Sequence, residues 1–242
     1  MPNWPINDQS RNPLIAVQVA KINDLIRELD EGNQHWLTDS ELARYQAITS
    51  SPRKNQFLTG HYLVRKMASR IFKNLPFDWI YYQDAEHMRR LKCNKDSQLE
   101  LYVSISHSGE WIAAAISHAP IGIDIETFTK LRNFLAIANH VFSESEITHL
   151  KYCDSEELKQ NFYLYWTLKE CVAKQYGHGL RFETSRAQTP ISVSESEQAC
   201  MHSWQCNEYV VSLATTLPND IDKNGLCSDA IHQRWQNIAS NL

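Results

Sequence analysis

Thr38-Asp39-Ser40-Glu41-Leu42 and Ser143-Glu144-Ser145-Glu146-Ile147 are the same signal placed twice, at an offset of 105 residues. In each stretch a hydroxyl residue is followed three positions later by glutamate, the capping box that starts a helix. The same offset then pairs apolar residues without a gap: Phe57 with Phe162, Leu63 with Leu168, and Ala68 with Ala173. We therefore expect an α+β fold of two similar halves, related by a pseudo-twofold axis, with the active site in the cleft between them.

The elements expected around these caps have the same order in both halves. The boundary should fall near Pro120, giving an N-terminal half of residues 1–119 and a C-terminal half of residues 120–242. Apolar spacing near 3.6 residues predicts a helix over Phe57–Phe72, after an interruption at Pro52, and another long helix over Asn161–Tyr176. Alternating or short apolar runs predict strands at Leu14–Ile22, Leu101–Ile105, Trp111–Ser117, Ile121–Glu126, Ile191–Ser194, Ser203–Cys206 and Tyr209–Ala214.

Composition excludes several classes of protein. The 242 residues are 43% hydrophobic, which indicates a folded chain. Only seven are glycine, and neither G-x-G-x-x-G nor G-x-x-x-x-G-K-[ST] can be written, which excludes the usual dinucleotide and ATP loops. A net charge of −4 argues against nucleic-acid binding. The longest apolar run, Trp111–Ile116, is far shorter than the ~20 residues of a membrane span.

Two further features bear on location and assembly. The N-terminus lacks the form of a signal peptide, and the six cysteines show no CxxC pair, so we expect a cytoplasmic protein with reduced thiols. Cys200 and Cys206 with His202 have the wrong spacing for a zinc site. We expect a monomer.

The sharpest local feature is Ile121-Gly122-Ile123-Asp124-Ile125-Glu126. In a strand its isoleucines share one face, and Gly122, Asp124 and Glu126 share the other. Two carboxylates about 7 Å apart along a strand repel each other, and a hard divalent cation such as Mg2+ would neutralise them. Gly122 would then leave room for a ligand. The alternative is a strand whose acidic face simply contacts water.

A second feature is Trp166-Thr167-Leu168-Lys169-Glu170-Cys171-Val172-Ala173-Lys174, where Glu170 and Lys174 are spaced i, i+4. The pair could be an ordinary exposed salt bridge. Alternatively, Glu170 adds a third carboxylate to the metal and Lys174 meets a phosphate. The spacing does not choose between them.

A third feature is Ser104-Ile105-Ser106-His107-Ser108-Gly109, at a junction of strand and turn. Hydroxyls, an imidazole and exposed amides can bind phosphate oxygens there. No G-x-S-x-G elbow is present, so a serine hydrolase is not indicated. Alone, the segment could be a turn with satisfied hydroxyls.

Together these three segments resemble the 4′-phosphopantetheinyl transferases, in particular the larger, single-chain, pseudo-dimeric type that serves carrier proteins of fatty-acid, polyketide and peptide synthases. That family carries S-H-S, then G-[IV]-D-[IV]-E, then W-[ST]-x-K-E-[SAC]-x-x-K, and here Ser106–Ser108, Gly122–Glu126 and Trp166–Lys174 match in type, order and separation. Gly177-His178-Gly179-Leu180 resembles the turn that follows the third motif. The resemblance covers most of residues 38–182.

The resemblance implies a reaction and a set of roles. A serine hydroxyl of an apo carrier protein would attack the β-phosphate of coenzyme A, and 3′,5′-ADP would leave. Asp124, Glu126 and Glu170 would hold Mg2+, or Mn2+ in its place, and Glu170 would also serve as the base. The N-terminal half would supply the phosphate and adenine contacts, and the C-terminal half the metal site and catalytic helix. The residues expected to contact coenzyme A are Ser106, His107, Lys169 and Lys174.

The sequence departs from the family in the pocket for the 3′-phosphate. Members carry a Gly-Lys-Pro turn upstream of S-H-S, whereas Leu91–Asp96 has neither glycine nor proline, and Gln56 stands where a basic residue is usual. The basic residues that could replace these groups are Arg44, Arg53, Lys54, Lys92 and Lys95. Arg65, on the helix equivalent to that of Glu170, is expected to be structural.

Two other functions remain open. One is a non-catalytic module that binds coenzyme A or a carrier protein, which would be marked by loss of a carboxylate or of Lys174; all four are present. The other is a Mg2+-dependent phosphohydrolase that would place water where the serine enters. By analogy, Thr127–Val141 forms part of the acceptor surface. The sequence does not identify the carrier protein or the breadth of its range.

Overall fold

The computed structural model describes residues 14–29, 35–129, 132–177, 179–180, 186, 188–193, 199–217 and 221–239. The first thirteen positions, on which the expected absence of a signal peptide depends, lie outside these ranges, as does His178 of the expected turn.

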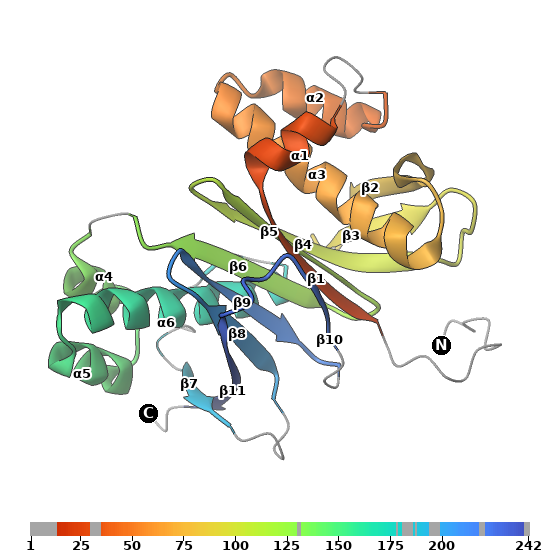
Figure 1. Cartoon of the computed structure of the whole chain (residues 1–242). Coiled ribbons are helices and arrows are strands. Elements are labelled where there is room, and N and C mark those ends of the chain that lie inside the picture. The colour runs from red at the N-terminus through yellow and green to blue at the C-terminus, as the bar shows by residue number, and fades with distance from the viewer. Residues whose placement is uncertain are drawn as a thin grey trace.

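Two sheets form the centre of the molecule, as expected for an α+β chain of two halves (Figure 1). The first has the order β10-β1-β5-β4-β3-β2 and the second the order β6-β9-β8-β11-β7. Every pairing is antiparallel except that of β1 with β10. The strands of the first sheet are β1 (Ile15–Lys21), β2 (Trp79–Gln83), β3 (Arg89–Cys93), β4 (Glu100–Ser108), β5 (Trp111–Ser117) and β10 (Ile221–Asn224). Those of the second are β6 (Ile121–Thr127), β7 (Gln188–Ser192), β8 (Met201–Gln205), β9 (Tyr209–Thr215) and β11 (Ile231–Ala239).

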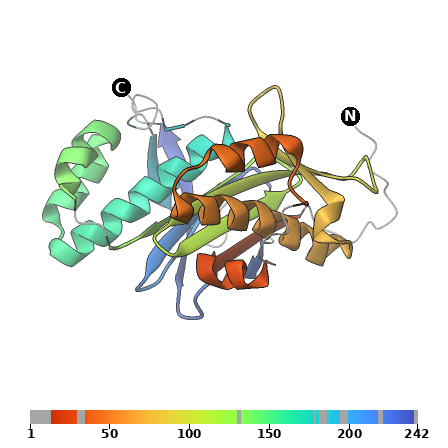
Figure 2. The same ribbon diagram turned by 90° about the horizontal axis from the view of Figure 1, so that it is seen from above.

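Each half adds its own helices. In the N-terminal half α1 (Ile22–Glu28), α2 (Asp39–Ala47) and α3 (Ser51–Phe72) lie over one face of the first sheet, followed by the short 3-10 helix η1 (Pro76–Asp78). In the C-terminal half α6 (Ser155–Gln175) packs on β6 and β9, and α4 (Phe134–Val141) and α5 (Glu144–Tyr152) pack on α6. Figure 2 shows α3 crossing the first sheet and α4 and α5 at the far end of α6.

The repeated caps have the same geometry in both halves. Thr38 N–H donates to Glu41 Oε2 over 2.8 Å and its hydroxyl accepts from Glu41 N. Ser143 N–H donates to Glu146 Oε2 over 2.7 Å and its hydroxyl accepts from Glu146 N. Each short capped helix then leads into a long one, α3 or α6. The predicted repeat is therefore a repeat of structure.

Several details differ from the sequence expectations, among them α1, α4, β10 and β11, which the sequence patterns do not predict. Pro52 does not interrupt a helix: it stands in the first turn of α3, where a missing N–H costs no hydrogen bond. The hairpin of β2 and β3 was not predicted. The boundary at Pro120 does separate β5 from β6, but β10 returns from the C-terminal half to extend the first sheet beside Ile15–Gln18. The division at residues 119 and 120 therefore does not hold for 221–224.

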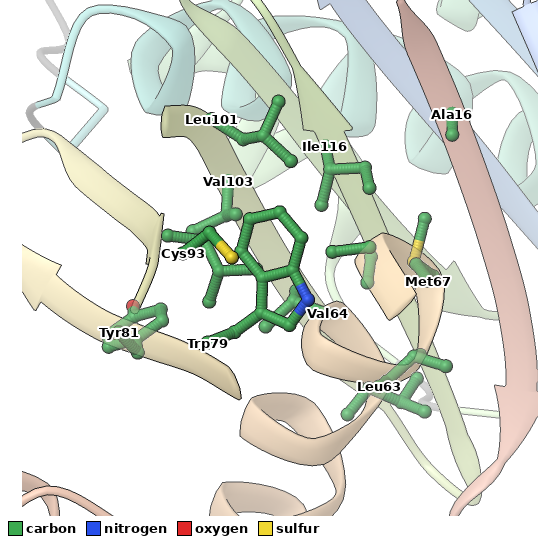
Figure 3. Packing of buried hydrophobic residues seen from close by; sticks show 14 of the residues in the cluster. Ala16, Leu63, Val64, Met67, Trp79, Tyr81, Cys93, Leu101, Val103 and Ile116 are labelled. Atoms are coloured by element: carbon green, nitrogen blue, oxygen red, sulfur yellow. The ribbon is translucent and has the colours of Figure 1, made fainter. Parts of the chain in front are cut away.

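Apolar clusters fill both sides of the first sheet. In Figure 3 the indole of Trp79 lies beside Val64, Cys93 and Val103, in a cluster between α3 and the first sheet. On the other face, Ile121, Ile123 and Ile125 of β6 join β1 and β5 in a second cluster. The three isoleucines therefore share one face, as their alternation predicts. No helix in the described residues is long and apolar enough to span a membrane.

The thiols of the described residues are all free, although Cys206 and Cys227 Sγ lie 3.2 Å apart. Arg65 is structural, as expected: fully buried, it makes two hydrogen bonds to the carboxylate of Glu41, over 2.9 and 2.8 Å. Burial alone would raise the pKa of Glu41, but hydrogen bonds from His61 and Arg65 outweigh it and lower the pKa to about 2.

A buried histidine of β8 should make stability depend on pH. His202 stacks with Trp204 and lies 3.3 Å, Nδ1 to Nε2, from His232. Burial, and then the nearby His232, Arg234 and Lys223, lower the pKa of His202 to about 4. Because the unfolded chain binds this proton more readily, stability is complete above about pH 6.5 and is lost as the pH falls towards 4.

We expect the free energy of unfolding to fall by about 2 kcal/mol more in the native protein than in His202→Leu between pH 7.5 and pH 5. Urea unfolding at the two pH values measures this difference. His140→Gln, which changes an exposed histidine, is the control. An equal loss in all three proteins would contradict the assignment to His202.

Candidate active site

Two carboxylates of β6 stand at the centre of the site. Asp124 is buried, with 6% of its surface exposed, and faces α6, whereas the isoleucines between the acidic positions face the first sheet. Asp124 Oδ1 accepts a 2.6 Å hydrogen bond from Ser106 Oγ, and Glu126 Oε2 accepts one of 2.6 Å from Ser108 Oγ. The predicted acidic face is therefore not simply a wet surface, because both carboxylates are held by side chains of β4.

Helix α6 brings a lysine and a third carboxylate to the same place. Lys174 Nζ lies 2.7 Å from Asp124 Oδ1 and 3.2 Å from the carbonyl oxygen of Ile123. The salt bridge of Lys174 is thus made with Asp124, on another element, and not with Glu170 four residues earlier. An ion pair between Lys174 and an acidic residue of β6 differs from the exposed salt bridge within the helix that the alternative interpretation expected.

Gly122 has a different role from the one expected: it lets α6 approach β6 closely. A Cβ atom at residue 122 would lie 1.8 Å from the carbonyl oxygen of Cys171 and 2.6 Å from Gln175 N. The space beside Gly122 is therefore occupied by the backbone of α6, so the expectation that it leaves room for a ligand is wrong. Its lack of a side chain lets α6 pack closely enough for Lys174 to reach Asp124.

Glu170 lies in an environment that favours its protonated form. Burial, followed by the charges of Asp124 and Glu126, raises the pKa of Glu170, and Lys174 partly opposes this. Glu170 and Lys174 line a small cavity of about 230 Å³, together with Arg89 and the His87–Met88 turn. A carboxylate with a raised pKa at a cavity is suited to accept and release a proton.

The donor set fits a hard divalent cation. Among the described residues, no three acidic, histidine or cysteine side chains already form a metal-binding group. However, the buried Asp124 Oδ2 has no hydrogen-bond partner within the described part of the chain, and Asp124 and Glu126 are close enough to raise the pKa of Glu170. Carboxylate oxygens are the ligands that Mg2+ and Mn2+ prefer, and a cation would relieve this repulsion.

A larger cavity of about 740 Å³ lies between α2, α3 and the first sheet. It brings together Arg44, Arg53 and His107, three of the residues expected to contact coenzyme A. Its walls include the rings of Phe57, His61 and Tyr81. The ring centroid of His61 lies 4.1 Å from that of Phe57, on which it stacks, and 4.2 Å from that of Tyr81. Guanidinium groups beside flat rings suit a ligand that carries both phosphates and a base.

Several predicted residues lie elsewhere. Lys54 Nζ lies over the ring of Tyr45 and does not line the cavity. Lys95 pairs with Asp78 over 2.8 Å, and neither it nor Lys92 lines either cavity. Ser106 gives its hydroxyl hydrogen to Asp124.

The expectation for Lys169 is corrected by its surroundings. Its ammonium group is buried and lies 3.0 Å from Glu146 Oε2. Burial raises the pKa of Glu146 and lowers that of Lys169, and each group partly offsets the change in the other. Lys169 therefore ties α6 to the cap of α5, and we do not retain it among the ligand contacts.

Sequence reasoning missed Arg89, which lines both cavities. The turn that faces the site comes before Arg89, whereas the stretch Leu91–Asp96 supplies neither Lys92 nor Lys95 to either cavity. Asp84 Oδ1 accepts from the backbone N–H groups of Glu86 and Met88, and His87 has a φ of 63°. An aspartate that begins a turn before two arginines was the available signal.

Comparison with known proteins agrees with this site. The family profile of the 4′-phosphopantetheinyl transferase superfamily matches residues 120–214, which contain all four residues Asp124, Glu126, Glu170 and Lys174. The 4′-phosphopantetheinyl transferase Sfp of Bacillus subtilis is 37% identical over 156 residues, which are 64% of this chain and 67% of that protein.

Two further relatives match over shorter lengths. The 4′-phosphopantetheinyl transferase gsp of Aneurinibacillus migulanus is 31% identical over 51% of this chain and 48% of its own length. The corresponding protein psf-1 of Bacillus pumilus is 30% identical over 53% of this chain and 52% of its own length. The matches thus span two thirds of the first relative and about half of the other two. With its two-half α+β fold and its acidic strand facing a Glu-x-x-x-Lys helix, the chain belongs to the 4′-phosphopantetheinyl transferase superfamily.

Proposed function

We propose that this protein transfers the 4′-phosphopantetheine arm of coenzyme A to a serine of an apo acyl or peptidyl carrier protein, releasing 3′,5′-ADP. The observation that carries the proposal is the group formed by Asp124, Glu170 and Lys174. It places a proton acceptor and an ammonium group at a cavity that shares Arg89 with the larger one. The names of the related proteins support the same reaction.

The two cavities suit different parts of coenzyme A. The larger one, about 740 Å³, is within the range of roughly 300–1,000 Å³ typical of small-molecule sites. Its rings would take the adenine, and Arg44 and Arg53 would take the 3′-phosphate. Arg89, common to both cavities, would lie along the diphosphate. The ammonium group of Lys174 would bind a phosphate oxygen and so weaken its contact with Asp124.

The chemistry at the small cavity follows from its charges. The carrier serine oxygen would form a bond to the β-phosphorus, the bond from that phosphorus to the bridging oxygen would break, and Glu170 would take the hydroxyl proton. Asp124, Glu126 and Glu170 would hold Mg2+ or Mn2+, which when bound offsets charge on the phosphate oxygens. Lys174 would stabilise the charge on the leaving 5′-phosphate of 3′,5′-ADP.

Transfer is tested by mixing the protein with coenzyme A, Mg2+ and an apo carrier protein and measuring the intact mass of the carrier. The expected result is a carrier heavier by one phosphopantetheine arm, with 3′,5′-ADP released. Free phosphopantetheine with an unmodified carrier would favour the phosphohydrolase instead. Binding of coenzyme A with no product of either kind would favour the non-catalytic module.

We also propose that the protein works as a cytoplasmic monomer, with coenzyme A and a carrier protein as its partners and no nucleic acid or membrane. The net charge of −4 supports the absence of a nucleic-acid partner. Light scattering after gel filtration tests the monomer.

The 3′-phosphate pocket gives a prediction of its own. Dephospho-coenzyme A lacks one doubly charged group, and charged hydrogen bonds contribute about 1.5–3 kcal/mol each, so it should bind roughly ten- to a hundred-fold more weakly than coenzyme A. Arg44→Glu should weaken coenzyme A by a similar factor and hardly change the dephospho form. Calorimetric titration of both ligands measures the two factors.

Lys54→Glu is the matched control, because Lys54 adjoins Arg53 on α3 yet does not line the cavity. It should bind both ligands as the native protein does. Equal affinity of the native protein for the two ligands would show that no 3′-phosphate pocket is present. The reaction class would stand in that case, and the substrate would need revision.

A further inference from the structure

Three alternate residues of β4, Ser104, Ser106 and Ser108, form a row of buried hydroxyls that faces β6. Alternate side chains of a strand point to the same face, so the row follows directly from the pattern S-x-S-x-S. β6 is the edge strand of the second sheet, and β9 covers only one of its sides. The row therefore joins the N-terminal half to the open edge of the strand that carries the acidic residues.

The three hydroxyls do different things along that edge. Ser104 Oγ accepts from Ile123 N over 3.0 Å and, among the described residues, bonds to no carboxylate. Ser106 Oγ donates to Asp124 Oδ1 over 2.6 Å. Ser108 Oγ does both: it accepts from Thr127 N over 3.2 Å and donates to Glu126 Oε2 over 2.6 Å. One serine thus holds backbone only, and the other two hold the carboxylates.

We propose that Ser106 and Ser108 are positioning residues that fix the Asp124 and Glu126 carboxylates for a divalent cation. This inference rests on the proposed function. Hydrogen bonds from a hydroxyl to a carboxylate are short and strong. Ser106 and Lys174 both bond to Oδ1 and so orient the carboxylate of Asp124, and its buried Oδ2 has no partner among the residues that the structure describes.

The hydroxyls of Ser106 and Ser108 hold two carboxylates of like charge in place. Asp124 and Glu126 share one face of β6 and carry like charges, so without the hydroxyls their side chains would be free to turn apart before a cation binds. Groups that orient the ligands of a metal usually contribute a factor of roughly 10–100 to metal affinity. Loss of either serine hydroxyl should therefore weaken cation binding without removing any ligand atom.

The experiment compares Ser106→Ala and Ser108→Ala with Ser104→Ala in the full chain. Mn2+ alone is titrated and its free fraction measured by electron paramagnetic resonance, with no coenzyme A present. We expect the first two variants to bind Mn2+ roughly tenfold or more weakly, and Ser104→Ala to stay within about twofold of the native protein. Ser108→Thr, which keeps the hydroxyl, should restore affinity. Thermal melting shows that each variant is folded.

Coenzyme A binding provides the second readout. Its affinity, measured without metal, should be unchanged in Ser108→Ala, because the Ser108 hydroxyl holds the Glu126 carboxylate. Weaker coenzyme A binding with unchanged Mn2+ affinity would overturn the inference and make the serines ligand contacts. An equal loss of Mn2+ affinity in Ser104→Ala would also overturn it, because the effect would then come from the strand edge.

The experiment distinguishes failure of the positioning role from failure of the proposed function. If the native protein binds Mn2+ and the variants behave as expected, but no carrier protein is ever modified, the positioning role stands and the transferase proposal fails. If the native protein binds no Mn2+, the positioning role itself is overturned.

Discussion

Asp124→Asn is expected to reduce the rate of transfer by a factor of roughly 10²–10⁴, because the cation of the proposed mechanism would contribute several kcal/mol of charge stabilisation and asparagine would offer it no charge. The substitution keeps the size of the side chain. One oxygen also remains to accept from Ser106 Oγ and Lys174 Nζ, the two groups that lie 2.6 and 2.7 Å from Oδ1. The loss should therefore appear in kcat without unfolding.

Two further measurements accompany Asp124→Asn: removal of metal from the native protein, and a matched control variant. The native protein should lose activity in EDTA and recover it with Mg2+ or Mn2+. Asp222→Asn, which removes an exposed carboxylate paired with Arg70, should leave the rate unchanged. Full activity of the native protein in chelator would rule out the metal assignment. Near-normal turnover of Asp124→Asn would show that transfer does not need the Asp124 carboxylate.

Glu170→Gln is expected to lower kcat by a similar factor of roughly 10²–10⁴, since glutamine can neither accept the serine proton nor offer a charge to a cation. The variant should be at least as stable as the native protein near neutral pH. Burial and the charges of Asp124 and Glu126 raise the pKa of Glu170. A carboxyl group with a raised pKa in the folded state contributes stability only while protonated and loses that contribution as the pH rises.

Thermal melting and steady-state kinetics together test this expectation. Glu156→Gln is the control on the same helix, because Glu156 is exposed at the beginning of α6. Lys174→Ala should lower kcat and also weaken coenzyme A binding, which separates it from Glu170→Gln. If Glu170→Gln turns over normally, Glu170 is neither base nor ligand, whatever its melting temperature.

Features that depend on near neighbours in the chain were predictable from the sequence. Both capping boxes join residues three positions apart, so a local pattern in the sequence indicates them. The isoleucines and acidic residues of β6 separate onto two faces because a strand alternates every second residue. These local periods, repeated at one offset, were enough to predict two α+β halves. The family motifs then indicated the residues of the acidic site.

Contacts between distant parts of the chain were decided only by the tertiary structure. Lys174 has Glu170 four residues away on its own helix, yet its ion pair is with Asp124, fifty residues earlier in the sequence. Lys169 stands beside Glu170 in the sequence but points into the core towards Glu146. Successive positions on a helix differ by about 100°, so neighbours in a motif face different surroundings.

The same reason explains Gly122, Arg89 and the serines of β4. No local period predicts that the backbone of α6 fills the space beside Gly122, or that the turn before Arg89 brings its side chain to both cavities. The S-H-S motif indicated a phosphate site, whereas the packing of β4 along the open edge of β6 gives the hydroxyls of Ser106 and Ser108 to carboxylates eighteen residues away. The sequence determined which groups are present and which face of its own element each occupies. The packing of the two halves decided which groups meet, because that depends on distances between elements that no local pattern contains.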